Sequence, residues 1–434
     1  MTQEAIVNIG GRVEDLPPEI HEEYLRYANL TCNSIHAMTF PETGLPADQL
    51  HYYTEDGKPT EKTHRIDKTS PTNIGFLLAC EGAAAAMGFI TYSAAVQNID
   101  MTLTTIEKMI ADPEVFIPTN GGKGLFVNWI QPSTSKVLRQ WPDISSPVKQ
   151  QLSTVDNAWF IAFIQLIGVQ FPEFSHRINS CLDRVDLPFM FDDQTGFFRG
   201  CYLLTPPGFE SWSYDVLSEA RIAYLVCNES VAEFMCNLIN HRSERSVFTD
   251  SIGHPGRATW DGGWFELGWP GILVPEGELN EQWDQTVAAT IQKQKEYGIE
   301  HNGGHYGYSA GLGPDSQYHE FRVPETGECT ASYEPQSVVT VSALVNMGLK
   351  EPIETHRALQ RLHWEFPDLI HVNNGDGDTV DTKTRVVQRD QLFANQAASL
   401  LTCWNVVQQK EPQNLFMRVV PPTIKDVYRR NALW

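Results

Sequence analysis

Three acidic residues in this sequence stand where a carboxyl group could do acid or base chemistry. Asp156, Glu219 and Asp390 each lie in or near the first turn of an apolar stretch with helical periodicity, on the stripe that would face the interior. Burial raises the pKa of a carboxyl group, which suits a proton donor. A helix N-terminus also stabilises negative charge, so capping could explain any one of them. Three together favour a site built from carboxylates.

The segment 213–226 shows this arrangement most clearly. From Ala220 onward it is apolar on nearly every side, with only Arg221 interrupting, and such a helix is normally buried. We expect Glu219 on the same helical face as Val226, partly stripped of water. The alternative is an ion pair with Arg221 or another cation that only joins helices. This segment alone leaves both interpretations open.

Paired carboxylates across a sugar-sized gap are the groups that hydrolyse glycosides: one protonates the leaving oxygen, and the other activates water or attacks directly. Aromatic side chains beside Gly-rich or polar stretches support this chemistry, because flat rings bind sugar faces. Several of them could equally be core residues. They are Trp129, Trp159, Trp260, Trp264, Trp269, Tyr306 and Tyr308.

Composition restricts the partners. The chain has 434 residues and a formal net charge of -22, which repels phosphate backbones and anionic bilayers, so we expect neither nucleic-acid nor membrane binding. No apolar run is long enough to span a membrane. Residues 1–7 lack the basic and apolar regions of a signal peptide, so the protein is expected in the cytoplasm, or in the periplasm or medium after removal of a leader.

Neither a metal nor another cofactor is expected. The eight cysteines form no C-x-x-C pair, and the thirteen histidines form no ligand array. The stretch 373–381 resembles a calcium loop but lacks the downstream bidentate glutamate, which favours a solvated loop.

The elements that must position these residues are mostly helices. Ser70 before Pro71 is a strong start signal, and Ser153-x-x-Asp156 has the spacing of a capping box. Helices are expected over 18–36, 71–88, 93–111, 157–169, 173–183, 213–226, 230–241, 279–297, 337–347, 353–366 and 390–407. Similar lengths and the lack of a linker predict one all-α domain over residues 1–434, an (α/α)6 toroid with short β-hairpins in the connecting loops. A helical solenoid is the alternative.

Six short motifs occur in an order that resembles a known family. They lie at residues 69–75, 153–159, 191–196, 214–221, 260–269 and 307–310. Together they resemble the glucoamylase-like domain of bacterial endo-β-1,2-glucanases and of the cyclisation region of cyclic β-1,2-glucan synthases. The resemblance extends from about residue 20 to residue 408.

This resemblance implies an (α/α)6 barrel that acts on β-1,2-linked glucan without a cofactor. Glu219, in Ser-Glu-Ala-Arg, would be the general acid, and Asp390, in Asp-Gln, the base. Transglycosylases of the synthase type carry a glutamate just after a motif that here reads Gly-Tyr-Ser-Ala at 307–310. This sequence has no glutamate at that position, which favours inverting hydrolysis. Glu266 or Glu320 could, however, serve as a nucleophile instead.

The remaining predicted site residues would hold sugars in the subsites. They are Asp156, Asn157, Arg65, Asn73, Trp129, Trp264, Glu266 and Tyr308. The alternatives are a related glycosidase or transglycosylase on another β-glucan, and a non-catalytic carbohydrate-binding protein. The exact glycan, endo or exo action and the oligomeric state stay open.

Overall fold

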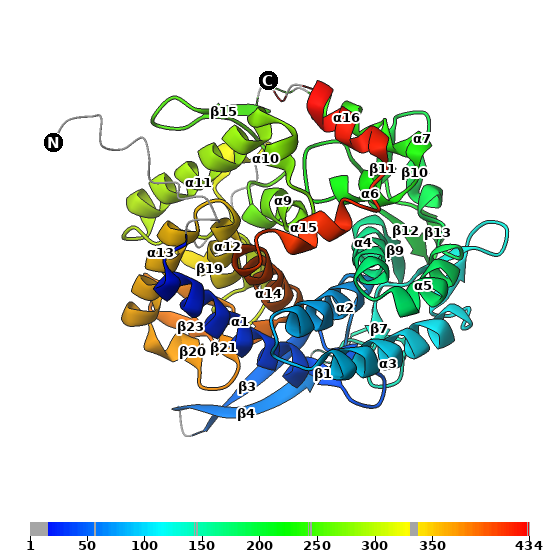
Figure 1. The fold of residues 1–434 in the computed structure, drawn as a ribbon, viewed down its shortest axis with the longest axis horizontal. Coiled ribbons are helices and arrows are strands. Elements are labelled where there is room, and N and C mark those ends of the chain that lie inside the picture. Colours follow the sequence, from blue (N-terminus) through cyan, green and yellow to red (C-terminus); the bar gives the residue numbers. More distant parts are fainter. Residues whose placement is uncertain are drawn as a thin grey trace.

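The computed structural model describes residues 16–55, 58–142, 144, 146–241, 243, 245–329, 337–431 and 433. Residues 1–7, for which no leader is predicted, lie outside this part. The helices form an (α/α)6 toroid, an inner ring surrounded by outer helices (Figure 1), which confirms the predicted fold class. Within the ring α2 packs against α4 and α14, α4 against α6, and α12 against α9 and α14. The inner helices are α2 (Pro71–Ala86), α4 (Thr154–Gln170), α6 (Arg221–Val226), α9 (Trp264–Gly268), α12 (Val341–Asn346) and α14 (Phe393–Val407).

The outer helices lie around the ring (Figure 1). They are α1 (Pro18–Met38), α3 (Tyr92–Ile110), α5 (Ser175–Leu182), α7 (Glu229–Ala232), α8 (Met235–Asn240), α10 (Glu276–Leu279), α11 (Glu281–His301) and α13 (Pro352–Glu365). Two further helices follow the last inner one: α15 (Glu411–Phe416) crosses the middle of the ring in Figure 1, and α16 (Pro422–Arg430) lies at its edge.

The inner helices are largely apolar, because neighbouring elements cover most of their surface. Nearly every residue of α2 is buried, and so are most residues of α4. Gly75 allows these two helices to approach closely, since a Cβ atom there would lie 2.9 Å from the Cα of Phe160. The predicted start signals hold as well: the Ser70 hydroxyl accepts from the amide of Asn73, and the Ser153 hydroxyl accepts from that of Asp156.

Small antiparallel sheets fill the loops between helices, as predicted. One three-stranded sheet, in the order β24-β3-β4, runs directly into α14; its strands are β3 (Gln49–Glu55), β4 (Lys58–Ile66) and β24 (Gln391–Leu392). The other strands are β1 (Thr39–Phe40), β2 (Leu45–Pro46), β5 (Phe116–Pro118), β6 (Gly124–Phe126), β7 (Ile130–Gln131), β8 (Lys136–Val137), β9 (Gln151–Ser153), β10 (Phe191–Asp192), β11 (Phe197–Arg199), β12 (Cys201–Leu204), β13 (Pro207–Phe209), β14 (Ser213–Tyr214), β15 (Val247–Thr249), β16 (Pro255–Arg257), β17 (Ala310–Leu312), β18 (Tyr318–Glu320), β19 (Val338–Thr340), β20 (Ile370–His371), β21 (Gly375–Asp376), β22 (Thr379–Asp381) and β23 (Val386–Gln388).

Four helix predictions need correction. The segment 213–226 is not one helix: it begins as strand β14, Glu219 stands in a turn in which the Ser218 hydroxyl accepts from the amide of Ala220, and α6 starts at Arg221. The segment 230–241 splits into α7 and α8. The helices predicted over 337–347 and 390–407 start later, because β19 and β24 pair with other strands first.

Among the described residues no single helix is long and apolar enough to cross a membrane. The helix pair Thr154–Gln170 and Pro172–Leu182 has the length and composition of a membrane span only when the two are taken together, and they are bent by 117° relative to one another.

Candidate active site

The polar site lies at the end of the ring where the inner helices begin. Hydrogen bonds join the starts of neighbouring helices: the Thr72 hydroxyl of α2 donates to Asp156 of α4 at 2.8 Å, and the carbonyl oxygen of Asp48 accepts from the amide of Phe393, the first residue of α14. The amide of Val341, which opens α12, donates to the carbonyl oxygen of Asp378. Loops and strands that precede the inner helices therefore meet at one rim.

Glu219 lies at this rim, and the pKa of its carboxyl group is raised. Its side chain is half-buried in the turn before α6. Burial, and after it the negative charges of Asp261 and Glu320, raise the pKa of Glu219 to about 7, although the positive charge of Arg221 opposes them. A carboxyl group with this pKa still holds a proton near neutral pH, as a general acid must.

Three further carboxylates surround Glu219. Glu266 is 3% exposed and accepts the amide N–H of Asp261 at 2.9 Å. Burial and the charges of Asp261 and Glu219 raise the pKa of Glu266 above its ordinary value. Glu320 is an exposed residue of β18, and partial desolvation and the charge of Asp261 raise its pKa to about 7. The sequence did not single out Asp261, which stands in a Gly-rich stretch without helical periodicity.

Arg221 is not the partner of Glu219. Its guanidinium is completely buried and forms a bidentate pair with Glu276, with Nε and Nη2 donating to the two carboxylate oxygens at 2.7 and 2.8 Å. The structural ion pair that the sequence left open therefore exists, but it is made with a residue of α10. The carboxyl group of Glu219 takes no part in that ion pair.

Asp156 belongs to the same rim. Its carboxylate accepts from the Thr72 hydroxyl at 2.8 Å and from the Asn128 side-chain amide at 2.6 Å. Burial, and then the charges of Glu219 and Asp156, raise the pKa of the half-buried Tyr214. Tyr214 therefore lies within electrostatic reach of both acids, which links the start of α4 to the turn of Glu219.

Asp390 lies at the start of β24, in contact with β3. The amide of Tyr52 donates to its Oδ1 at 2.8 Å, and the Gln49 side-chain amide donates to Oδ2 at 3.3 Å. The Nδ1 atom of His51 lies 2.9 Å from Oδ2. The Asp390 side chain is only 4% exposed, whereas that of His51 is 40% exposed. Of these two contacting side chains, only that of His51 is substantially open to solvent.

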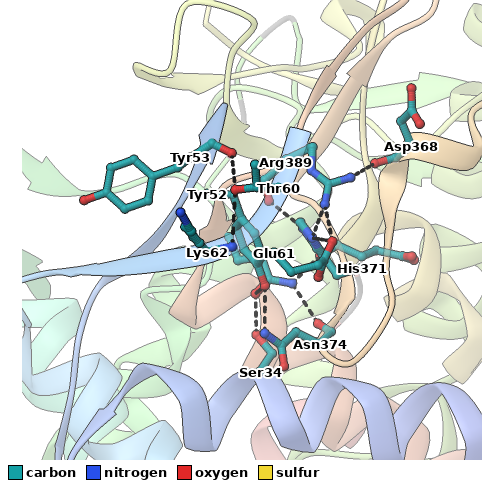
Figure 2. A network of polar contacts seen from close by, with 12 residues as sticks. Ser34, Tyr52, Tyr53, Thr60, Glu61, Lys62, Asp368, His371, Asn374 and Arg389 are labelled. Carbon is teal, nitrogen blue, oxygen red and sulfur yellow. Dashed lines mark hydrogen bonds and ion pairs between the residues drawn. The ribbon is translucent and has the colours of Figure 1, made fainter. Parts of the chain in front are cut away.

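A polar network on the other side of β3 holds this strand in place (Figure 2). The Tyr52 ring stacks on His371 at 3.6 Å, and Nη2 of Arg389 donates to Glu61 at 2.7 Å and to Nδ1 of His371 at 2.8 Å. Burial and the charge of Arg389 lower the pKa of His371 to about 3, so its ring is neutral. This network fixes the backbone that positions Asp390.

Three of the predicted sugar-binding residues are buried in the protein, and a fourth, Arg65, is half-buried and bonded to the backbone. The buried side chain of Asn157 pairs with both backbone groups of Phe126, and Trp264, 2% exposed, donates its Nε1–H to Asn346. Tyr308 is 1% exposed, and the Arg65 Nε–H donates to the carbonyl oxygen of Ala37. The side chains of Asn157, Trp264 and Tyr308 pack inward, so we do not include them in the site, whereas Arg65 is half-buried and stays a predicted sugar-binding residue.

Two other predicted sugar-binding residues, Asn73 and Trp129, lie near the rim. Asn73 is buried at the start of α2 and donates to the Asp48 carboxylate at 2.8 Å. Trp129 is half-buried, with its ring edge-on to Trp141 at 5.7 Å. Both lie close to the rim, and only Trp129 has part of its ring exposed.

Exposed aromatic rings stand next to the carboxylates. Trp260 is 51% exposed and directly precedes Asp261, and Tyr318 is 56% exposed on β18, two residues before Glu320. An exposed aromatic face beside polar groups suits a sugar ring. Trp260 was predicted as a site aromatic; Tyr318 was missed because its loop shows no periodic signal.

The other end of the ring carries a depression of about 740 Å³ that differs in character. Gly271, Leu349 and Gln409, which follow the C-terminal ends of α9, α12 and α14, line it. The acids Glu278 and Asp284 in its wall form ion pairs with Lys410 and Lys350. Its lining includes Trp264 and Leu267, the neighbours of Glu266 in α9, but not Glu219, Asp261 or Glu320. Within the described part of the chain, no three His, Cys, Asp or Glu side chains are grouped to hold a metal ion.

Solved structures share this fold. No protein-family model and no curated protein matches the chain. A candidate glucoamylase from Bacteroides uniformis superposes with a TM-score of 0.71 at 13% identity, covering 96% of this chain and 98% of that one. An endo-β-1,2-glucanase from Chitinophaga pinensis, in complex with sophorotriose and glucose, gives 0.68 at 12% identity, covering 96% and 98%. An endo-β-1,2-glucanase mutant from Talaromyces funiculosus, in complex with β-1,2-glucan, gives 0.66 at 11% identity, covering 96% and 92%. At such identities the likeness concerns the fold alone.

Proposed function

We propose that this protein is a glycoside hydrolase that cleaves β-1,2-glucan or its oligosaccharides with inversion of the anomeric configuration. The observation that carries the proposal is Glu219: a half-buried carboxyl group with a pKa of about 7, free of the neighbouring Arg221–Glu276 pair and placed at the rim beside exposed aromatic rings. This combination suits protonation of a leaving oxygen.

In this mechanism Glu219 donates its proton to the glycosidic oxygen as the bond breaks. Asp390 accepts the proton of the attacking water, directly or through a substrate hydroxyl, while Gln49, His51 and the Tyr52 amide hold its carboxylate in place. The rings of Trp260 and Tyr318 provide faces for the sugars on either side.

The choice of β-1,2-glucan rests on the resemblance of the ordered motifs, supported by the glucan and sophorotriose complexes of the two endo-β-1,2-glucanases that share the fold. A neutral glycan also suits the charge of -22, because the acidic rim would repel an anionic polymer.

Retaining transglycosylation is the second candidate, and one observation favours it. Glu320 is exposed, and its charge, like that of Asp261, raises the pKa of Glu219. A nucleophile in a retaining enzyme stands close to its general acid, at about 5–5.5 Å. Glu320 has the accessibility that such a nucleophile needs.

The decisive experiment is incubation with linear β-1,2-glucan, followed by NMR of the first products. Initial release of the α-anomer supports inversion, and initial release of the β-anomer overturns it in favour of retention. Parallel incubations with β-1,3-glucan and α-1,4-glucan test the linkage. Binding of glucan without turnover would instead identify a carbohydrate-binding protein.

A further inference from the structure

A buried chain of polar contacts runs from the C-terminal helix α16 to the turn that carries Glu219. The Tyr428 hydroxyl donates to Oε1 of Glu276 at 2.6 Å, and Glu276 in turn accepts two hydrogen bonds from Arg221. Tyr428 and Arg221 are 0% exposed, and Glu276 is 4% exposed. These contacts join residues that are 55 and 152 positions apart in the chain.

Arg221 uses its remaining N–H groups on backbone oxygens. Nη1 donates to the carbonyl oxygens of Ser218 at 2.8 Å and Glu266 at 2.6 Å, and Nη2 donates to that of Leu267 at 2.7 Å. A guanidinium has five N–H donors, and with the Glu276 pair all five are engaged. One side chain therefore ties the residue before Glu219 to helix α9, which carries Glu266.

The guanidinium is itself held in place. It lies over the Trp283 ring, 5.2 Å from the centroid, and this ring packs edge-on against Tyr428 at 5.3 Å. The side-chain amide of Asn280 donates to the carbonyl oxygen of Tyr428 at 2.7 Å, which fixes α16 to the start of α11. Arg221 is thus enclosed by residues of α10, α11 and α16.

We infer that Tyr428 and Glu276 are positioning residues for the proton donor: through Arg221 they fix where the Glu219 carboxyl group stands relative to the glycosidic oxygen. This inference rests on the proposed role of Glu219. Proton transfer requires hydrogen-bond reach, and a displacement of about 1 Å can cost on the order of 100-fold in rate. The C-terminal helix, although outside the inner ring, would then influence the chemical step.

The test compares two variants that each lose one buried hydroxyl. Tyr428→Phe removes the hydrogen bond to Glu276. Tyr24→Phe removes a buried hydrogen bond to the carbonyl oxygen of Pro352, 3.0 Å long and made by α1 at the start of α13, and serves as the matched control. Each variant is assayed on linear β-1,2-glucan and on dinitrophenyl β-sophoroside, whose leaving group departs without a proton. Thermal midpoints are recorded for both.

Tyr428→Phe should lower kcat on the glucan about tenfold with KM within about twofold, and should change cleavage of the dinitrophenyl substrate less than about twofold. Tyr24→Phe should lower the thermal midpoint similarly but leave both activities unchanged. Equal losses on the two substrates, or glucan activity that matches the Tyr24 control, would overturn the inference.

Arg221→Lys is the second variant, because it keeps the charge but cannot engage five acceptors. It should show the same contrast between substrates. The proposed function is tested separately: if Glu219→Gln still cleaves glucan, the assignment of the acid fails. If Glu219→Gln is inactive while Tyr428→Phe behaves like Tyr24→Phe, only the positioning role fails.

Discussion

Asp390 and His51 meet where β24 pairs with β3, with Oδ2 of the aspartate 2.9 Å from Nδ1 of the histidine. The aspartate is enclosed and the histidine is partly open to solvent. If Asp390 takes a proton from water, His51 is the solvent-exposed side chain in contact with its carboxylate. The two residues should therefore act together.

Substitutions at this pair should reduce turnover to different extents. Asp390→Asn removes the proposed base and should lower kcat by about 1,000-fold. His51→Gln, which disturbs the carboxylate but keeps it, should lower kcat by about tenfold or more. Steady-state kinetics on β-1,2-glucan measure both. His64→Gln, on the exposed residue opposite His51 in β4, is the control and should retain full activity. Near-full activity of Asp390→Asn would remove Asp390 from its role.

Substitution of the proposed acid, Glu219, should reduce turnover as strongly as substitution of Asp390. Glu219→Gln keeps the shape of the side chain but cannot donate a carboxyl proton, so kcat on glucan should fall by about 1,000-fold or more while the fold is retained. Circular dichroism checks the fold and product analysis checks the rate. Glu233→Gln, on an exposed residue between α7 and α8, should behave as the wild type. An active Glu219→Gln enzyme would require a different proton donor.

The pH dependence of activity should report the raised pKa of Glu219. Burial first, and then the charge of Asp261, place this pKa at about 7. The proposed acid works only when protonated, so kcat/KM should be level below about pH 6, bend near pH 7 and fall about tenfold per pH unit at higher pH. An alkaline limb centred near pH 4.5 would show that the group is not perturbed.

The same shift predicts how stability changes with pH. Glu219 has an ordinary pKa of 4.5 and a folded-state pKa of about 7, so the folded protein binds more protons than the unfolded chain between these values. Its contribution to stability is complete below pH 4.5 and is lost as the pH rises through 7. Denaturant titrations across this range should show a smaller decline in Glu219→Gln. An equal decline in the variant would assign the effect to other groups.

Exposed aromatic rings should contribute to binding more than to turnover. Trp260→Ala removes a ring that is 51% exposed next to Asp261, and KM for glucan should rise about five- to tenfold with a small change in kcat. Trp364→Ala is the matched control, since this tryptophan is 83% exposed on the outer helix α13. The KM of the Trp364→Ala variant for glucan should stay unchanged. Equal effects of the two substitutions would show that Trp260 contacts no sugar.

Local signals in the sequence predicted most of the fold. Helical periodicity and the capping residues Ser70 and Ser153 located the longer inner helices, because these signals depend on neighbours three or four residues away. The turn at Glu219 was missed, since an apolar stretch buried by other elements resembles a buried helix. The strand starts before α12 and α14 depend on partners such as Leu50, far away in the chain.

The site was less accessible to sequence reasoning. The roles of Glu219 and Asp390 are predictions from their positions before apolar helices and from the family resemblance, and they stay predictions. The grouping of Asp261 and Glu320 around Glu219 arises only when separate loops meet. Likewise, Arg221 pairs with Glu276 rather than with its neighbour in sequence, and no local pattern predicts a partner 55 residues away.

Helix α15 closes one end of the ring. It packs against α4 and α14 at the end of the ring remote from Glu219, with Phe416 completely buried and the Gln413 side chain bonded to the carbonyl oxygen of Gly271. The ring is therefore a cup and not a tunnel. The proposed glucan substrate could not be threaded through it: the chain would have to lie across the mouth, and both fragments would depart by the face through which it arrived.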